Sequence, residues 1–250
     1  MARHLPSPYV RGMQSLNMPR ALLTARPLAL AVLMAVAAAA AVPALSHMGV
    51  IGLPVGPAAP PSLPDCLDAD LPASRSAYDE WATTLLDTTY RLSPDYQPPD
   101  LVVVGHGPAT TRLRAFVVPE LLAMIEAARA DGVSIRVTSG HRSHERQAAV
   151  FEELVNERGE EHARRWAARP GHSEHQLGTT VDLQGGADWL AQHAWRFGFL
   201  MSYPAGRSPQ WTCYGPEPWH YRYFGRDRAA AIRASGLSPR EWLWEREMRR

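Results

Sequence analysis

The chain has 250 residues, 46% of them hydrophobic and 20% charged, and its formal net charge is +1. A chain of this size and composition can bury a core without disulfides or metals. Its balanced charge excludes a protein that binds nucleic acid through a strong overall positive field.

The first 44 residues have the pattern of an export signal. Arg20 and Arg26 precede an uncharged apolar run, 28–42, which small residues follow. A basic start, a short apolar stretch and a small-residue exit are typical of secretory signals. The run is shorter than the ~20 residues of a full membrane span, but the chain stays nearly uncharged up to Pro61, so a retained anchor is the alternative. We expect an exported protein, either secreted or anchored at the cell envelope.

A Pro-rich stretch, 45–64, is typical of a semi-extended linker. Residues 65–250 then form one predicted domain without an internal repeat. This domain contains 22 Arg and 25 acidic residues, so it is mildly acidic. Cys66 and Cys213 both lie in this domain. Pairs of cysteines outside the cytoplasm tend to oxidise, so we favour a disulfide. Two free thiols are the alternative, because a sequence cannot show that the two residues are close.

Helix and strand patterns are mixed along this domain. Apolar residues recur at spacings of three and four between Leu113 and Ala128, which predicts a helix. The alternation over 133–138 predicts a half-buried strand. The other predicted helices are 77–90, 144–156, 188–197, 227–235 and 239–248, and the other predicted strands are 101–104, 180–183, 199–203 and 219–224. Without a steady strand-helix alternation, this pattern favours an α+β fold over a doubly wound sheet.

Three segments, 139–147, 170–182 and 215–222, concentrate residues suited to chemistry. His175, Asp182 and His220 supply the two nitrogen donors and one oxygen donor that a catalytic zinc takes while keeping one position open. Asp182 lies in an apolar strand candidate, where an unpaired carboxylate would be costly to bury. Glu217, three residues before His220, could take a proton from water beside the metal. By spacing alone, however, each His is more often a surface or core residue than a ligand.

The three segments together resemble the VanY-type D-alanyl-D-alanine carboxypeptidase family, whose pattern the related L,D-carboxypeptidases of the LdcB kind share. The resemblance covers roughly residues 91–245. It is carried by Ser139-Gly140-x-Arg142-Ser143 with Gln147, Ser173-x-His175-x-x-Gly178 with Asp182, and Glu217-x-x-His220.

The resemblance implies a small α+β domain, with an antiparallel sheet and flanking helices, that Hedgehog-type zinc domains share. It implies Zn²⁺ as the cofactor, held by His175, Asp182 and His220. The implied substrates are peptidoglycan stem peptides that end in D-alanine. Nucleic acid is not an expected partner, and the oligomeric state stays open.

The resemblance also implies roles for four residues around the metal. Glu217 matches the catalytic base, and Arg142 matches an Arg that faces the scissile carbonyl. Ser173 and Gln147 match positions that line the substrate pocket. These roles suit a hydrolase, because Arg142 could neutralise the oxyanion and Glu217 could protonate the departing amine.

Two positions depart from the family pattern. Thr180 replaces a small Ala, and His141 replaces an aromatic residue such as Tyr, which leaves the pocket shape and the substrate preference open. We expect His141 and His172 to line or rim the site. We expect Trp219 to point into the core, because alternate residues of a strand face opposite sides.

Other activities share these motifs. An L,D-carboxypeptidase or a cross-link endopeptidase would use the same metal chemistry and differ only in the pocket. A non-catalytic, zinc-stabilised wall-binding module is a further alternative. Such a module has no need of Glu217, whereas this chain keeps the ligands, the base and Arg142 together.

Overall fold

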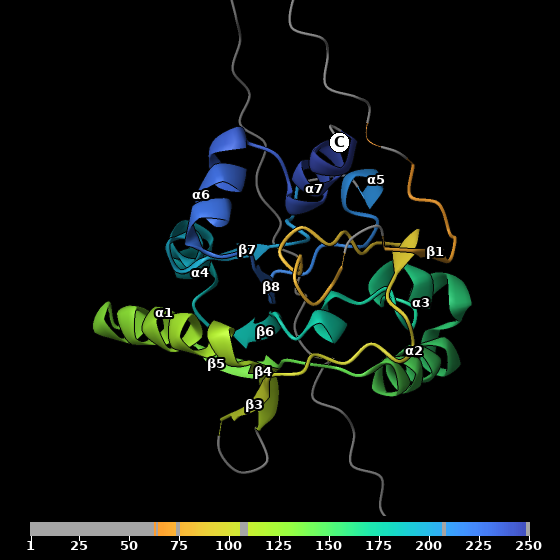
Figure 1. Ribbon diagram of the computed structural model, residues 1–250. Helices are drawn as coiled ribbons and strands as arrows, with labels where there is room; N and C mark the ends of the chain where they lie inside the picture. Colours follow the sequence, from red (N-terminus) through yellow and green to blue (C-terminus); the bar gives the residue numbers. More distant parts are fainter. Residues whose placement is uncertain (1–62, 64, 74–75, 106–109, 207–208, 249–250) are drawn as a thin grey trace, which may run out of the picture. The chain divides into compact units, whose positions relative to one another are not determined.

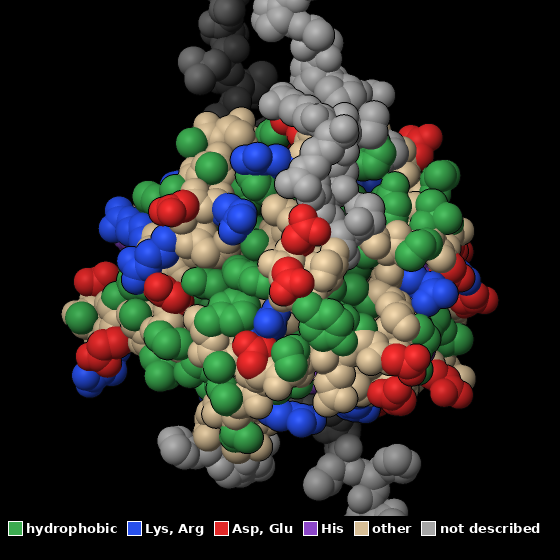
Figure 2. Space-filling model, in the orientation of Figure 1, with side chains coloured by type: hydrophobic (Ala, Val, Ile, Leu, Met, Phe, Trp, Pro, Cys, Tyr) green, Lys and Arg blue, Asp and Glu red, His purple; other side chains and the backbone are tan. Residues whose placement is uncertain are grey.

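The computed structural model describes residue 63 and residues 65–73, 76–105, 110–206 and 209–248 (Figure 1). The predicted leader, 1–44, and nearly all of the predicted linker, 45–64, lie outside these residues. In the described segments, no helix combines the length and the apolar character that crossing a bilayer requires. Acidic and basic side chains intersperse on the face of the molecule shown in Figure 2.

A four-stranded antiparallel sheet with the order β5-β6-β8-β7 positions the site. Its strands are β5 (Arg136–Ser139), β6 (Thr180–Gln184), β8 (His220–Tyr223) and β7 (Phe199–Met201). The register places Asp182 opposite His220 and Val181 opposite Tyr221. Because residues opposite each other in an antiparallel pair share a face of the sheet, this register separates a polar face from an apolar one.

The apolar face of the sheet carries the main core. Val181, Phe199 and Tyr221 pack there against Leu121 and Met124 of α1 (Val118–Ala130), and all five are nearly or fully buried. Leu190 of α4 (Ala187–His193) and Ala194 of the 3₁₀ helix η4 (Ala194–Phe197) belong to the same cluster. The opposite face is left for the polar residues of β6 and β8, Asp182 and His220 among them.

The remaining elements flank this sheet (Figure 1). Helices α6 and α7 share a second core with Phe224 and Leu85. Two small strand pairs complete the domain: β3 with β4 is antiparallel, and β1 with β2 is parallel. The bounds are β1 (Leu71–Pro72), β2 (Tyr90–Arg91), β3 (Leu101–Val104), β4 (Thr111–Arg114), η2 (Ala115–Val117), α2 (His144–Arg158), α3 (Glu160–Trp166), η3 (Glu174–Leu177), α5 (Pro209–Thr212), α6 (Arg226–Ser235) and α7 (Pro239–Met248).

The mixed helices and small sheets confirm the predicted α+β fold class, but the predicted helix over 77–90 is wrong. This segment forms turns that lead into β2. The hydroxyls of Thr83 and Thr84 both donate to the carbonyl of Glu80. The amides of Glu80 and Thr84 each close one helical turn, onto the carbonyls of Ser76 and Glu80, but the turns do not continue into a helix. The pattern starting at Leu113 is also divided: Leu113 belongs to β4, and the α-helix begins only at Val118.

A disulfide joins Cys66 to Cys213, and it closes a loop of 147 residues in sequence. It anchors an arm, 65–73, which ion pairs also hold. Arg164 pairs with Asp68, and Arg169 reaches Asp68 at 2.9 Å and Asp70 at 2.8 Å. The structure therefore brings the two cysteines together, as favoured from the sequence.

His172 fastens the same arm from the inside. It is fully buried, with Nδ1 2.7 Å from the Asp87 carbonyl and Nε2 2.9 Å from the Asp70 carboxylate. Both ring nitrogens are thus engaged away from the predicted ligands. His172 supports the arm, although its sequence position beside Ser173 suggested a place on the rim of the site.

Replacing both cysteines by Ser should lower the free energy of unfolding by about 2–5 kcal/mol, because the 147-residue loop would regain chain entropy in the unfolded state. Urea unfolding of residues 65–250 measures this, with Asp68→Asn as a control that removes only exposed ion pairs, which are typically worth ~1 kcal/mol or less. An unchanged unfolding midpoint in the double Ser variant would contradict the bracing role of the disulfide.

Candidate active site

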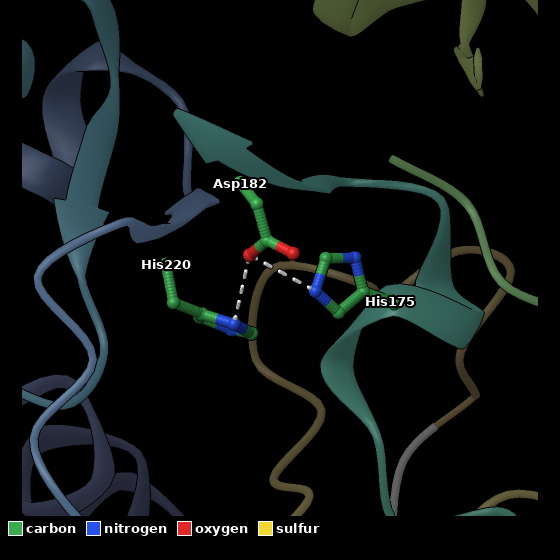
Figure 3. Close-up of side chains that lie close together, drawn as sticks. All are labelled: His175, Asp182 and His220. Atoms are coloured by element: carbon green, nitrogen blue, oxygen red, sulfur yellow. Dashed lines mark ion pairs between the residues drawn. The ribbon is translucent and has the colours of Figure 1, made fainter. Parts of the chain in front are cut away.

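His175, Asp182 and His220 converge on one point of the polar face of the sheet (Figure 3). Each offers a ligand atom, and these atoms all lie within 4.8 Å of one another. His175 Nε2 is 3.3 Å from Asp182 Oδ1, and His220 Nδ1 is 3.5 Å from the same oxygen. The structure thus brings together the three residues that the sequence predicted as ligands.

The local fold explains how the three side chains meet. The strand register sets Asp182 beside His220. His175 lies in η3, whose first turn is capped by the Ser173 hydroxyl, which accepts a hydrogen bond from the His175 amide. Gly178 ends that turn with φ +72°, and a Cβ there would approach side-chain atoms of Leu101 and Arg114 to 3.0–3.1 Å. Glycine is therefore required where the chain turns from η3 into β6.

A backbone carbonyl orients the His175 ring. His175 Nδ1 lies 2.7 Å from the oxygen of Gly140, so its Nδ1–H donates and its Nε2 lone pair faces Asp182. Burial lowers the pKa of His175, which favours the neutral ring that a metal needs. Gly140 itself must be small, because a Cβ would come within 2.7 Å of the Arg112 carbonyl.

The charge of the site fits a cation. Asp182 Oδ1 is buried and has no hydrogen-bond partner of good geometry among the described residues, a situation that ordinarily costs free energy. Burial would raise the pKa of Asp182, but His175 and His220 hold it well below its usual value. The carboxylate is therefore ionised, and a metal ion would satisfy its buried oxygen together with the two imidazoles.

His220 is surrounded by carboxylates. Its Nδ1 lies 3.3 Å from Glu217 Oε2, and its Nε2 lies 3.0 Å from Glu174 Oε2. Burial would lower the pKa of His220, but the neighbouring carboxylates of Asp182, Glu174 and Glu217 raise it well above the usual value. So much negative charge around one buried ring favours a positive ion at this position.

Glu217 and Arg142, the predicted base and cation, both lie beside the three ligand candidates. A backbone hydrogen bond of 2.9 Å from the Glu217 amide to the Tyr203 carbonyl places Glu217, whose side chain is 14% exposed. Arg142 Nη2 is 3.7 Å from Asp182 Oδ2. Burial lowers the pKa of Arg142, whereas Asp182 and Glu217 raise it. The carboxylate of Glu217 therefore lies beside His220, and the guanidinium of Arg142 lies beside Asp182, so that both groups border the three ligand candidates.

Gln147 and Ser173 lie close by, with their polar groups engaged within the protein. Gln147 is 1% exposed, accepts a hydrogen bond of 2.8 Å from Arg142 Nη1, and donates one of 2.6 Å to the Ala168 carbonyl. It therefore holds the Arg142 guanidinium in place. Ser173, 4% exposed, caps η3. The structure brings both residues to the site, and their contact with substrate stays a prediction.

The expectation that Trp219 packs into the core is wrong, because Trp219 is 43% exposed. It precedes β8, which begins at His220, and its carbonyl accepts a hydrogen bond from the Leu183 amide. His141 lies near His175, and burial lowers its pKa to about 4. Its Nε2 is buried without a hydrogen-bond partner among the described residues, and its place on the rim of the site stays a prediction.

The sequence reasoning missed Glu174, Ser202 and Arg222. Glu174 is 4% exposed and contacts His220, Ser202 and Arg222 through its two oxygens. Burial would raise the pKa of Glu174, but the Arg222 guanidinium and the bonds from His220 and Ser202 lower it to about 2. Its position directly before His175 was the one available signal, and it points toward the wrong histidine.

Comparison with known proteins agrees with this geometry. The family described as "VanY: D-alanyl-D-alanine carboxypeptidase" matches residues 110–226. A D-alanyl-D-alanine carboxypeptidase of Enterococcus faecalis is 34% identical over 182 residues, 66% of this chain and 66% of the relative. The putative carboxypeptidase YodJ of Bacillus subtilis is 30% identical over 180 residues, 64% of this chain and 66% of the relative. The chain thus spans 66% of the length of each of these curated relatives.

Solved structures cover the domain more fully. The vancomycin-resistance D,D-pentapeptidase VanY of a VanB-type cassette, in complex with Zn(II), has 32% identity and a TM-score of 0.58, with 65% of this chain and 99% of that chain covered. The LdcB LD-carboxypeptidase has 26% identity and a TM-score of 0.61, with 72% and 98% covered. With these motifs, this fold and these relatives, the chain belongs to the VanY family of D-alanyl-D-alanine carboxypeptidases.

Proposed function

We propose that the protein is a zinc-dependent carboxypeptidase that removes C-terminal D-alanine from peptidoglycan stem peptides. The observation that carries the proposal is the convergence of His175, Asp182 and His220 on one point, with Glu217 and Arg142 beside it. Family membership supports the reaction class. A relative of 32% identity whose structure contains D-alanine-D-alanine supports the substrate class.

The metal would be held by His175 Nε2, a carboxylate oxygen of Asp182 and His220 Nδ1. This donor set is typical of catalytic zinc, which keeps one further position open. When bound, zinc lowers the pKa of a water molecule toward ~7 and polarises the peptide carbonyl. The two imidazoles serve as ligands only with the facing nitrogen unprotonated.

Glu217 moves the proton. Its Oε2 lies 3.3 Å from His220 Nδ1, so it borders the position where the metal and the water would sit. Glu217 takes the proton of the water that attacks the carbonyl carbon. It then delivers this proton to the D-alanine nitrogen as the carbon–nitrogen bond breaks.

Arg142 stabilises the charge that develops on the carbonyl oxygen. A fixed guanidinium is suited to this task, because its donors are already oriented before the reaction. Gln147 and Ser139 orient it here, with hydrogen bonds of 2.8 and 3.4 Å. A C-terminal carboxylate also needs a cationic partner, and we assign this task to Arg142, with Gln147 and Ser173 as the predicted residues of the pocket.

The proposed substrate supports a location outside the cytoplasm. We propose that residues 1–44 are an export signal or a membrane anchor, that 45–64 are a linker, and that 65–250 are the catalytic domain. The Cys66–Cys213 disulfide supports this location, because such bonds persist in oxidising compartments.

A second activity has its own support. The structure of the LdcB LD-carboxypeptidase resembles this chain with a TM-score of 0.61, so cleavage between an L-residue and a terminal D-alanine is the alternative. His141, which stands in the first motif, is the residue most suited to alter the pocket. Peptides that end in D-Ala-D-Ala, D-Ala-D-lactate or L-Lys-D-Ala would separate these specificities by their relative kcat/KM.

Glu217→Ala should lower kcat by about 10²–10⁴-fold on a peptide that ends in D-Ala-D-Ala, because the proton carrier is lost. Zinc content should stay at the level of the unaltered protein. Release of D-alanine and metal analysis measure the two effects. The matched control is Glu157→Ala, which removes an exposed Glu of α2. If Glu217→Ala cleaves as fast as the control, Glu217 is not the base. If the unaltered protein binds zinc but cleaves no peptide, a wall-binding module becomes the better account.

Zinc binding to the metal-free protein at pH 7 should release a proton. The neighbouring carboxylates of Asp182, Glu174 and Glu217 raise the pKa of His220, so its Nδ1 carries a proton that the metal must displace. Zinc affinity should therefore rise with pH until the pH exceeds that raised pKa. Calorimetry in two buffers with different ionisation enthalpies measures the release. Equal heats of binding in both buffers at pH 7 would contradict the protonated state of His220.

A further inference from the structure

We propose that Glu174 is a positioning residue that fixes the His220 ring and makes Nδ1 the nitrogen offered to the metal. This inference rests on the proposed zinc site. Glu174 directly precedes His175, but its carboxylate contacts the other histidine ligand, whose position is 46 residues further along the chain.

The two ring nitrogens of His220 face different carboxylates: Nε2 faces Glu174, and Nδ1 faces Asp182. Glu174 Oε2 lies 3.0 Å from Nε2, and the Ser202 hydroxyl donates to the same oxygen at 2.6 Å. On the other side of the ring, Nδ1 lies 3.5 Å from Asp182 Oδ1. His220 is 4% exposed and Glu174 is 4% exposed, so bulk water has little access to this contact.

Arg222 holds the other oxygen of Glu174. Its Nη1 donates to Glu174 Oε1 at 2.8 Å, while its Nη2 donates to the carbonyls of Trp81 and Thr84 at 2.7 and 2.8 Å. Arg222 is fully buried and lies two residues after His220 on β8. Side chains two apart on a strand point to the same face, so His220 and Arg222 contact one carboxylate from the same strand.

This arrangement selects one tautomer of a neutral His220. An ionised carboxylate only accepts hydrogen bonds, so the nitrogen that faces Glu174 must carry the hydrogen. The lone pair of the neutral ring then lies on Nδ1, toward Asp182. His175 is oriented in the same manner by an acceptor, the Gly140 carbonyl, on its outward nitrogen. Glu174 therefore orients the His220 ring in the way that the Gly140 carbonyl orients the His175 ring.

Glu174 and Arg222 could instead form an ion pair that serves folding alone. Glu174→Gln separates the two roles, since the side chain keeps its shape. Its amide oxygen would accept from Arg222, and its NH₂ group would then face His220 Nε2. The ring would have to accept there and carry its hydrogen on Nδ1, where the metal should bind. Partners of this kind are typically worth about 10- to 100-fold in metal affinity.

The experiment compares zinc affinity by chelator competition at one pH for the full chain and its variants. We expect Glu174→Gln to bind zinc about 10- to 100-fold more weakly, with the metal-free variant still folded by circular dichroism. In the zinc-loaded unaltered protein, ¹H–¹⁵N correlation should show the hydrogen of His220 on Nε2. This signature shows which nitrogen binds the metal, and the zinc affinity of the folded Glu174→Gln variant then tests whether Glu174 favours that nitrogen.

The matched control is Asp87→Asn. Asp87 and Arg240 form another buried ion pair, with 2.8 Å between Asp87 Oδ2 and Arg240 Nε, and side-chain exposures of 1% and 5%. The Asp87 carboxylate accepts hydrogen bonds from the Thr89 and Tyr90 amides and from Arg240, and none of these is a predicted zinc ligand. Asp87→Asn should lower the thermal midpoint of unfolding and leave zinc affinity unchanged.

The outcomes separate the inference from the proposed function. If Glu174→Gln loses stability like Asp87→Asn but keeps the zinc affinity of the unaltered protein, the positioning role is overturned and the zinc site stands. If the unaltered protein binds no zinc, the proposed function fails and the inference fails with it. Should Glu174→Gln not fold, Glu174→Asp is the variant to measure. Its shorter side chain keeps the negative charge but moves the carboxylate away from His220 Nε2. Weaker zinc binding by Glu174→Asp supports the role, and unchanged binding overturns it.

Discussion

The site depends on negative charge buried around two imidazole rings. Asp182, Glu174 and Glu217 all contact His220, and their side chains are at most 15% exposed. Buried charges are costly unless they are paired. Arg222 neutralises Glu174, and Arg142 approaches Asp182 at 3.7 Å, but the point between Asp182 and the two rings still calls for a cation. A divalent metal bound there would balance this charge and, with Glu217 beside it, would supply the chemistry of the proposed peptidase.

The rest of the fold keeps these groups in place. The β6–β8 register fixes Asp182 against His220, and the apolar face of the same strands packs on α1. The disulfide-bonded arm, 65–73, also helps to hold Arg142 in place, although it does not carry a site residue. Arg169 donates hydrogen bonds to the Ala69 and Thr88 carbonyls. The carbonyl of the preceding residue, Ala168, accepts a hydrogen bond from Gln147, and Gln147 in turn accepts one from Arg142. The position of the Arg142 guanidinium is thereby tied to the arm that Cys66 anchors.

The sequence predicted the α+β class and brought forward His175, Asp182 and His220, because ligand residues must be of particular types and stand in recognisable motifs. It failed where the decisive contact is tertiary. Glu174 looks like a neighbour of His175, and only the folded strands reveal its bond to His220. The segment 77–90 closes single helical turns at Glu80 and Thr84 but does not continue them, which its helix-like pattern did not reveal. The exposure of Trp219 depends on where β8 begins, and strand ends are poorly marked in sequence.

Anomalous diffraction at the zinc edge, from crystals of the protein grown with zinc, tests the central claim most directly. The account predicts one strong peak bonded to His175 Nε2, Asp182 and His220 Nδ1, with Glu217 beside its open side. A zinc ion bound to other residues, or His220 turned so that Nε2 faces the metal, would contradict it.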